Sequence, residues 1–260
     1  MISQPDANQR TALTQTLAVS RLRPYRSVFG GDTNSGLSLY LYEMELVAAM
    51  QQIVAALEVL MREQMHQSLT AVYGVNWYYT QRSELDDRTR GQISKVHKYL
   101  GKSPSPGKVV AEMDFGTWTY LLETGGFIEE GTPSARKADY DTHLWQSALV
   151  NAFPNAGTAT RTDIGLLARR ARWARNRMAH RESILFGFPH PGQRDATGAL
   201  IRQTPISLLE DLRTLAGYLN ADIGHWLRSC VAPDALLASK AAQMALTYAQ
   251  TTLYSTRAWV

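Results

Sequence analysis

The chain has 260 residues, of which 27 are lysine or arginine and 23 are aspartate or glutamate, so its formal net charge is +4 at neutral pH. Hydrophobic residues make up 45% of the sequence, which excludes a disordered chain and is ample for a sizeable core. The single cysteine, Cys230, excludes an intrachain disulfide and argues against cysteine-ligated zinc. One cysteine is typical of a protein from a reducing compartment.

Two stretches were considered as a possible signal peptide and a possible membrane span. Met1–Arg10 is polar, has no basic-then-apolar signal-peptide pattern, and is expected to fray. The most apolar stretch, Leu46–Met61, is interrupted by Gln51, Gln52 and Glu58, and it is shorter than the roughly 20 apolar residues that a membrane span needs. We therefore expect a cytoplasmic protein without a membrane segment.

The longest patterned segment is Leu37–Tyr73, in which apolar residues recur every three or four positions. Gly30, Gly31 and Asp32 mark a turn before it, Asn34 or Ser35 could cap it, and Gly74 ends it. Its apolar stripe consists of Leu37, Leu41, Met44, Val47, Met50, Val54, Leu57, Met61, Met65, Leu69 and Val72. This segment is predicted to be the central helix of the fold.

Further helices are predicted from the same periodicity and from Gly and Pro punctuation. They cover Thr11–Val19, Asp87–Leu100, Lys108–Leu122, Asp141–Phe153, about Thr160–Leu185, Pro205–Cys230 and Asp234–Ser255. Arg21–Tyr25 contains Pro24, and loops are expected at Asn76–Arg88, Lys102–Gly107, Gly125–Arg136 and Phe186–Gln203. No useful alternating strand pattern and no internal repeat is found. The prediction is an all-α bundle of about seven helices, with an N-terminal extension over 1–20 and a single domain over 21–260.

Positive charge is concentrated in Arg169–Leu185, which reads RRARWARNRMAHRESIL and contains Glu182 as its only acid. It has no Gly or Pro, and its Ala, Arg, Leu and Met residues favour a helix, so we predict the last turns of the helix that begins near Thr160. A local basic patch of this kind is what a phosphate backbone recruits.

Within this stretch lie Arg175, Asn176 and His180. A neutral imidazole can take a proton from a sugar hydroxyl near neutral pH, while a guanidinium keeps its proton and binds a phosphate as a fixed fork. A five-residue step rotates about 140° on a straight helix, so Arg175 and His180 share a face only if the helix ends or bends near Ala179. Asn176, four residues before His180, could orient either group. The alternative is a helix-end histidine beside a solvated basic face.

The Arg175–His180 spacing resembles the Arg-x4-6-His signature of HEPN domains, which are all-helical. RNRMAHRESIL is similar to the RNRxAHHEPI segment of Abi-like (abortive infection) proteins, a branch of that superfamily. Upstream segments fall in that family's order, so that the resemblance covers about residues 20–230: SRLRPY, GGDTNSGLSLYLYEMELVAAM, LEVLMREQ, VVAEMDFGTWTYLL, LW and FP. The chain departs from the pattern at Arg181, where the family usually has a second His, and at Ser183, where it usually has Pro.

The resemblance implies a metal-independent endoribonuclease that needs no cofactor and cuts single-stranded RNA to 2′,3′-cyclic phosphate ends. His180 would be the general base, Arg175 the phosphate-binding group and Asn176 the orienting residue, while Arg172, Arg177 and Arg181 would bind RNA. In HEPN proteins two such motifs face one another, commonly across a homodimer. The implied role is phage defence by abortive infection or toxin-like growth arrest, with a small-RNA or protein antitoxin as a further partner.

Glu58 and Arg62 are four residues apart in acid-first order on the predicted central helix. Family members often carry an acid and an arginine in this region, so this pair is expected to support the site; the alternative is a surface ion pair. Trp77, Tyr78 and Tyr79 could stack on bases, although packing at a helix junction is favoured.

Two other functions compete with the nuclease. The same arginines could hold RNA or a nucleotide without catalysis, or they could dock an acidic protein partner. Metal chemistry is disfavoured, because the remaining histidines lie on separate segments without metal-ligand spacing: His66, His97, His143, His190 and His225.

Overall fold

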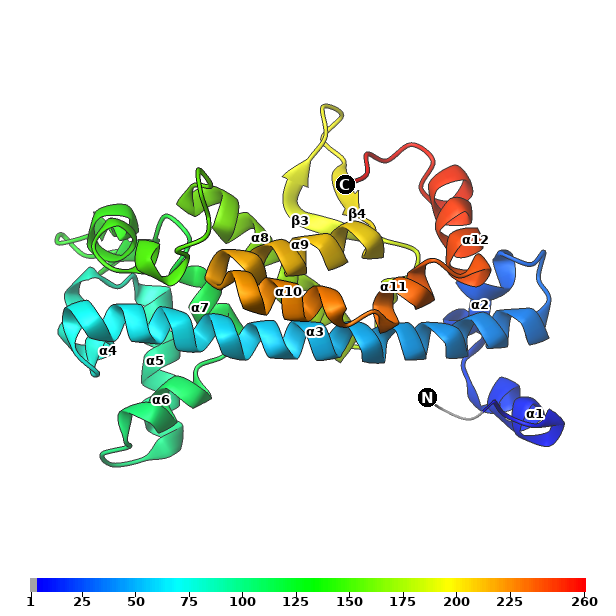
Figure 1. Cartoon of the computed structure of the whole chain (residues 1–260), viewed down its shortest axis with the longest axis horizontal. Helices are drawn as coiled ribbons and strands as arrows, with labels where there is room; N and C mark the ends of the chain where they lie inside the picture. The colour runs from blue at the N-terminus through cyan, green and yellow to red at the C-terminus, as the bar shows by residue number, and fades with distance from the viewer. Residues whose placement is uncertain (1–3) are drawn as a thin grey trace. The chain divides into compact units, whose positions relative to one another are not determined.

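The computed structural model describes residues 4–260 and is mostly helical (Figure 1). Helices account for 66% of the chain and strands for 6%, so the predicted all-helical character is confirmed at the level of fold class. The chain divides into two compact units: unit 1 comprises Met1–Ile53, Trp173–Glu210 and Cys230–Val260, and unit 2 comprises Val54–Arg172 and Asp211–Ser229. The N-terminal extension over 1–20 and the single domain over 21–260 stay predictions.

The predicted central helix is confirmed as α3, Thr33–Tyr73, which contributes to both units. Its cap is Asp32, whose carboxylate accepts the Ser35 N–H at 2.7 Å, and not Asn34 or Ser35 as expected. The helix ends before Gly74, which has a φ of 81°. By length and composition α3 is apolar enough to cross a membrane. The core helix of a soluble protein meets the same criteria. The buried apolar side chains of α3 are Leu37, Leu39, Leu46, Met50, Ile53, Val54, Leu57, Met61, Met65 and Leu69. Of the predicted stripe, Met44 and Val72 are exposed, and Leu41 and Val47 are half-buried.

Unit 1 begins with α1 (Ala7–Thr16) and α2 (Val19–Ser27). The segment expected to fray is helical from Ala7, because Asp6 and Gln9 form a reciprocal capping box; its first three residues lie outside the described ones. The Arg21–Tyr25 segment, including Pro24, is part of α2. The predicted helix from about Thr160 to Leu185 is α8, Arg161–Ala179, and its end before His180 corrects the predicted boundary.

The loop predicted over Phe186–Gln203 is instead a hairpin of β3 (Phe188–Arg194) and β4 (Leu200–Gln203), antiparallel with Phe188 opposite Gln203 (Figure 1). The physical reason is a local turn: the Asp195 carboxylate accepts the N–H groups of Thr197 and Ala199 at 2.9 and 3.0 Å, and Gly198 adopts a φ of 81°. The C-terminal residues extend this sheet, because the Arg202 N–H donates to Ala258 and the Val260 N–H donates to Arg202.

The last two predicted helices are each broken. Pro205–Cys230 forms α9 (Pro205–Leu219) and α10 (Ala221–Ser229), since the Asn220 side chain accepts the N–H of Asp222 and caps a new helix. Asp234–Ser255 forms α11 (Ala232–Leu237), α12 (Lys240–Tyr248) and a π-helical turn over Ala249–Leu253, with Ser239 capping α12.

Unit 2 contains the second part of α3 and shorter elements. These are α4 (Trp77–Thr80), a 3-10 turn (Arg82–Glu84), α5 (Asp87–Leu100), α6 (Pro106–Glu112), α7 (Phe115–Tyr120), β1 (Phe127–Ile128), β2 (Arg136–Lys137), a π-helical segment (Asp141–Gln146) and a 3-10 turn (Leu149–Ala152). The α5 prediction is confirmed.

Four predictions need correction in unit 2. The helix predicted over Asp141–Phe153 is a π-helical segment followed by a 3-10 turn, with Ser147 and Ala148 between them. The helix predicted over Lys108–Leu122 breaks because Asp114 caps α7 through the Thr117 N–H at 2.6 Å. Short helical turns replace the loop expected over Asn76–Arg88, and the loop expected over Gly125–Arg136 contains the paired β1 and β2.

Candidate functional site at the end of helix α8

Helix α8 presents its basic side chains because its apolar residues take up one face. Ile164, Ala168, Ala171, Ala174 and Met178 recur at helical spacing and are buried, so the residues between them lie toward the surface. In the last turns Arg175 is exposed, while Asn176 and Arg177 are half-buried. The sequence pattern therefore places the predicted site residues on the outward side of α8.

The helix ends in a Schellman motif that sets the position of His180. The N–H of Glu182 donates to the carbonyl of Arg177 at 2.9 Å, and the N–H of Arg181 donates to that of Met178 at 3.1 Å. Arg181 has a φ of 58°, a left-handed conformation that is usual for glycine at this position and costs another residue about 1–2 kcal/mol. His180 is therefore the C-cap residue, exposed at the mouth of the turn.

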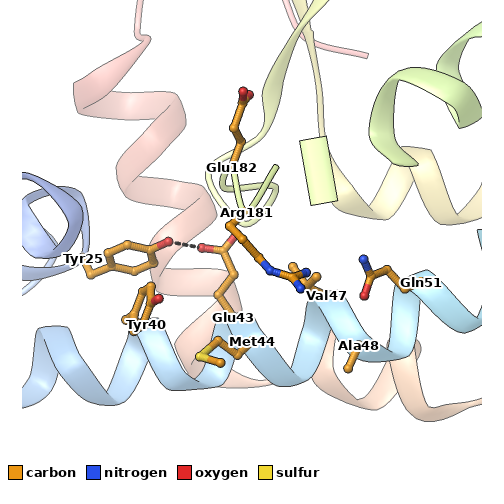
Figure 2. Close-up of a pocket in the computed structure, with 9 residues that line it drawn as sticks. All are labelled: Tyr25, Tyr40, Glu43, Met44, Val47, Ala48, Gln51, Arg181 and Glu182. Atoms are coloured by element: carbon orange, nitrogen blue, oxygen red, sulfur yellow. Dashed lines mark hydrogen bonds between the residues drawn. The ribbon is translucent and has the colours of Figure 1, made fainter. Parts of the chain in front are cut away.

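A buried carboxylate anchors the chain that follows. Glu43 on α3 is 4% exposed and accepts the N–H groups of Ile184 and Leu185 at 2.7 and 2.9 Å. It also accepts the Ser183 hydroxyl at 2.8 Å and the hydroxyl of Tyr25, which Figure 2 shows. Four donors satisfy this carboxylate, which is what a buried charge requires. The turn bearing His180 and Arg181 is therefore tied directly to α3.

Helix α2 supports the same turn from a second direction. Arg21 donates from Nη1 to the carbonyl of Arg181 at 2.6 Å, and the ring of Tyr25 lies edge-on to Tyr40 and Phe186 with centroids 5.3 Å apart in each case. Burial, together with the charge and hydrogen bond of Glu43, raises the pKa of Tyr25 well above its ordinary value. Tyr25 therefore stays a proton donor to Glu43 over the physiological range.

Sequence reasoning missed Glu43, although a signal was present. Leu39, Leu46 and Met50 are buried at helical spacing from position 43, so an acid interrupts an otherwise apolar stripe. A charged residue at such a position needs hydrogen-bonded partners from elsewhere in the fold. Ser183, one of the departures from the Abi-like pattern, supplies one of them through its hydroxyl.

A hollow of about 290 Å³ opens beside the anchored turn (Figure 2). One wall is formed by α3 residues, among them Tyr40, Met44 and Val47, and Arg181 and Glu182 of the turn lie at its edge. An apolar wall next to a guanidinium and a carboxylate suits a flat, polar-edged ligand.

The predicted catalytic residues are placed as follows. Arg175 donates from Nη1 to the side-chain oxygen of Asn176 at 3.4 Å, and the backbone carbonyl of Asn176 accepts the N–H of His180 at 2.9 Å. Within residues 4–260 no protein group forms a hydrogen bond with the His180 imidazole. The ring is thus accessible, and its orientation is not fixed by a neighbouring side chain.

The predicted RNA-binding arginines differ in their surroundings. Arg177 is half-buried, pairs with Glu182 at 2.8 Å and lies 5.6 Å from the ring centroid of Phe188; burial lowers its pKa. Arg181 is exposed. Arg172 belongs to unit 2, where it donates to the Thr119 hydroxyl at 2.9 Å and lies over the Tyr120 ring. The Nη1 of Arg181 donates to the Met178 carbonyl at 3.3 Å.

The expected supporting pair also belongs to unit 2. Arg62 lies 3.4 Å from the carboxylate of its neighbour Glu63 and donates to the Ala111 carbonyl, while Glu58 is half-buried. Their predicted support of His180 stays a prediction.

Packing is confirmed for two of the three predicted aromatic residues. Trp77 and Tyr78 are fully buried, with Trp77 5.8 Å from the Trp118 ring, whereas Tyr79 is half exposed and stacks on His97.

Among the described residues, no group of three or more His, Cys, Asp or Glu side chains is placed to hold a metal ion. No family model, curated protein or solved structure matches the chain.

Proposed function

We propose that this protein is a metal-independent endoribonuclease of the HEPN type that cuts single-stranded RNA. The observation that carries the proposal is the placement of His180: an exposed imidazole at the C-cap of α8, flanked by Arg181 and preceded by the exposed Arg175, on a turn anchored by buried Glu43. The resemblance of RNRMAHRESIL to the Abi-like segment supports the same assignment.

In the proposed reaction, His180 takes the proton of a ribose 2′-hydroxyl and the 2′-oxygen attacks the adjacent phosphorus. The bond from phosphorus to the 5′-oxygen breaks, and that oxygen receives a proton from an imidazolium. The products are a 2′,3′-cyclic phosphate and a 5′-hydroxyl. Arg175 holds the phosphate and stabilises its developing charge. Single-stranded RNA is the expected substrate, because in-line attack needs a flexible sugar and duplex RNA hides its base edges.

The hollow beside the turn would receive a base next to the cut linkage. Tyr40, Met44 and Val47 provide its apolar wall, and Arg181 places a positive charge at its edge, where a phosphate would pass.

A second copy of the chain completes the proposed site. The His180 ring has no orienting partner among the described residues of its own chain, and a general base works best when another group fixes its orientation. We therefore include a homodimer in the proposal, with two α8 ends facing one basic cleft. The proposed setting is the cytoplasm, in phage defence by abortive infection or in toxin-like growth arrest restrained by a small-RNA or protein antitoxin.

The test is RNA cleavage by the purified full chain, with a chelator present, over a range of pH. We expect products ending in 2′,3′-cyclic phosphate by mass spectrometry. His180→Ala should slow cleavage at least about 100-fold, the lower end of what general acid–base catalysis contributes, and should still bind RNA. His225→Ala, at another exposed histidine, is the matched control and should cut at the wild-type rate. Intact RNA with the wild-type protein, or unchanged cleavage by His180→Ala, would contradict the proposal.

The same unpartnered imidazole favours one alternative, a non-catalytic RNA- or nucleotide-binding module. In that case RNA would bind at low salt, with affinity reduced by Arg175→Ala, and would never be cut. Binding without cleavage by the wild-type dimer would select this alternative.

A further inference from the structure

A second basic hollow belongs to unit 1 and is lined by residues other than those of the hollow beside the His180 turn. This hollow, of about 380 Å³, is bordered by the β3–β4 hairpin and by the residues after α12, and it is lined by Arg194, Arg202, Arg257 and Tyr254 among others. Three arginines line this hollow, and none of the described residues that line it is acidic. Like charges gathered without a counter-ion repel one another, so the arrangement is stabilised when an anion binds.

Arg202 forms the floor of this hollow and is unusual for an arginine. It is 7% exposed, its Nη2 donates to the Gly187 carbonyl at 2.6 Å, and its Nε has no hydrogen-bond partner among the described residues. Its guanidinium lies 3.4 Å from the Tyr254 ring centroid and 5.6 Å from that of Trp259. No carboxylate in residues 4–260 pairs with it. Burial, with the nearby charges of Arg177 and Arg257, lowers its pKa.

A buried charge without a carboxylate partner is expensive, because aromatic rings, a side-chain hydrogen bond with Tyr254 and one carbonyl replace only part of its hydration. Backbone pairing nevertheless fixes Arg202 in this position. Its N–H donates to Ala258 and its carbonyl accepts the Val260 N–H, both at 2.8 Å, while the Thr204 N–H donates to Val260 at 3.0 Å. The site is therefore built before any ligand arrives.

The other two arginines lie at the rim. Arg194 is exposed and donates from Nη1 to the Gly198 carbonyl at 2.6 Å, which holds its guanidinium at the hairpin tip. Arg257 is exposed on the C-terminal segment, where its N–H donates to the Tyr254 carbonyl at 3.0 Å. Planar guanidinium forks bind phosphoryl oxygens through paired N–H groups, and this hollow is lined by three of the residues that carry them.

We propose that the hollow between the β3–β4 hairpin and the C-terminal segment is a binding site for a phosphoryl group, contacted by Arg194 and Arg257 and stabilised by the charge of Arg202. The phosphoryl group could belong to an RNA backbone or to a free phosphate or mononucleotide. The inference goes beyond the proposed nuclease activity, because it concerns binding and holds whether or not His180 cleaves RNA.

The experiment measures binding of three probes to the full-length protein by titration calorimetry: inorganic phosphate, adenosine monophosphate and a short single-stranded RNA. The variants are Arg194→Ala and Arg257→Ala, both at exposed positions, so that the buried Arg202 and the fold stay in place. Arg23→Ala, at an exposed arginine of α2 in the same unit, is the matched control.

We expect each rim variant to weaken binding at least about tenfold and the control to leave it unchanged. If phosphate and the mononucleotide bind and are weakened, the ligand is a free phosphoryl compound. If only RNA is weakened, with the slope of log affinity against log salt falling by about 0.7 per variant, the ligand is an RNA backbone. Equal binding of all three probes by wild type and both rim variants would overturn the proposal. His180→Ala should leave binding at this hollow unchanged. Failure of the phosphoryl-site proposal can therefore be distinguished from failure of the nuclease proposal.

Discussion

The carboxylate of Glu43 accepts the Ser183 hydroxyl at 2.8 Å and, through the same oxygen, the Ile184 N–H at 2.7 Å, which joins α3 to the turn after α8 across 140 residues of sequence. This contact holds the turn in place directly after His180 and the left-handed Arg181. The residues of the proposed site are thus positioned by a buried group that would not itself touch RNA.

Replacing Glu43 with Gln should lower the free energy of unfolding by about 2–4 kcal/mol, because the amide can no longer accept from four donors and at least one N–H or O–H is left buried and unpaired. Urea unfolding measures this. Glu45→Gln, two residues along α3, is the control and should change stability by less than about 0.5 kcal/mol. A Ser183→Ala, Glu43→Gln double variant should show a coupling energy above about 0.5 kcal/mol; strict additivity would mean that the contact does not stabilise the turn.

Replacing Gly187 with Ala should weaken the backbone pairing of the C-terminal residues 258–260 with Arg202. Gly187 has a φ of 64°, and an added Cβ would lie 2.3 Å from the Trp259 ring and 2.9 Å from the Gln203 carbonyl oxygen. Gly198→Ala is the matched control, since its φ is also positive, at 81°, and no atom lies within 4 Å of the added carbon. The control should lose about 1–2 kcal/mol from backbone strain alone, and Gly187→Ala about 2 kcal/mol more from overpacking.

Hydrogen exchange at residues 258–260 checks this prediction. Faster exchange in Gly187→Ala than in Gly198→Ala is expected, because Trp259 must move away and the pairing of Arg202 with Ala258 and Val260 is lost. Equal protection in the two variants would show that the ring can shift without opening this pairing.

Tyr25 should make stability depend on alkaline pH. Burial first, and then the charge of Glu43, raise the pKa of the folded-state phenol above the unfolded value of about 10. The stabilisation is therefore complete below about pH 10 and is lost as the pH rises through the higher folded pKa, because the unfolded chain releases this proton first.

Between about pH 9 and about pH 11, the wild type should lose stability more steeply than Tyr25→Phe, although the variant starts about 1 kcal/mol lower because Glu43 loses a donor. Urea midpoints across this range measure the slopes. Tyr99→Phe, at a tyrosine that is 76% exposed, should follow the wild-type profile. Parallel profiles of wild type and Tyr25→Phe would rule out the proposed coupling to Glu43.

The helices were predictable where pattern and cap agree. Asp86 caps α5 one residue before its predicted start, and the helical period of α3 was visible in the sequence, although Met44 and Val72 of the predicted stripe are exposed. The breaks at Asp114, Asn220 and Ser239 were missed because side-chain caps compete with an apolar periodicity that continues across them. The three capping side chains are visible in the sequence and could have revealed these breaks.

The β3–β4 sheet could be predicted only in part from the sequence. The turn at Asp195 and Gly198 is a local signal, but the backbone of Arg202 also pairs with C-terminal residues more than 50 positions away. Partners at that distance are chosen by packing, which no periodicity encodes.

By itself the sequence determined the helical class, the length of α3 and the concentration of arginines around His180, because these depend on residue type and on spacing within a few turns. The tertiary structure decided where α8 ends, which arginines are paired, and that Glu43 and Arg202 are buried. Those outcomes depend on hydrogen bonds and desolvation between segments distant in sequence, and a charged side chain shows whether it is satisfied only once its neighbours are in place.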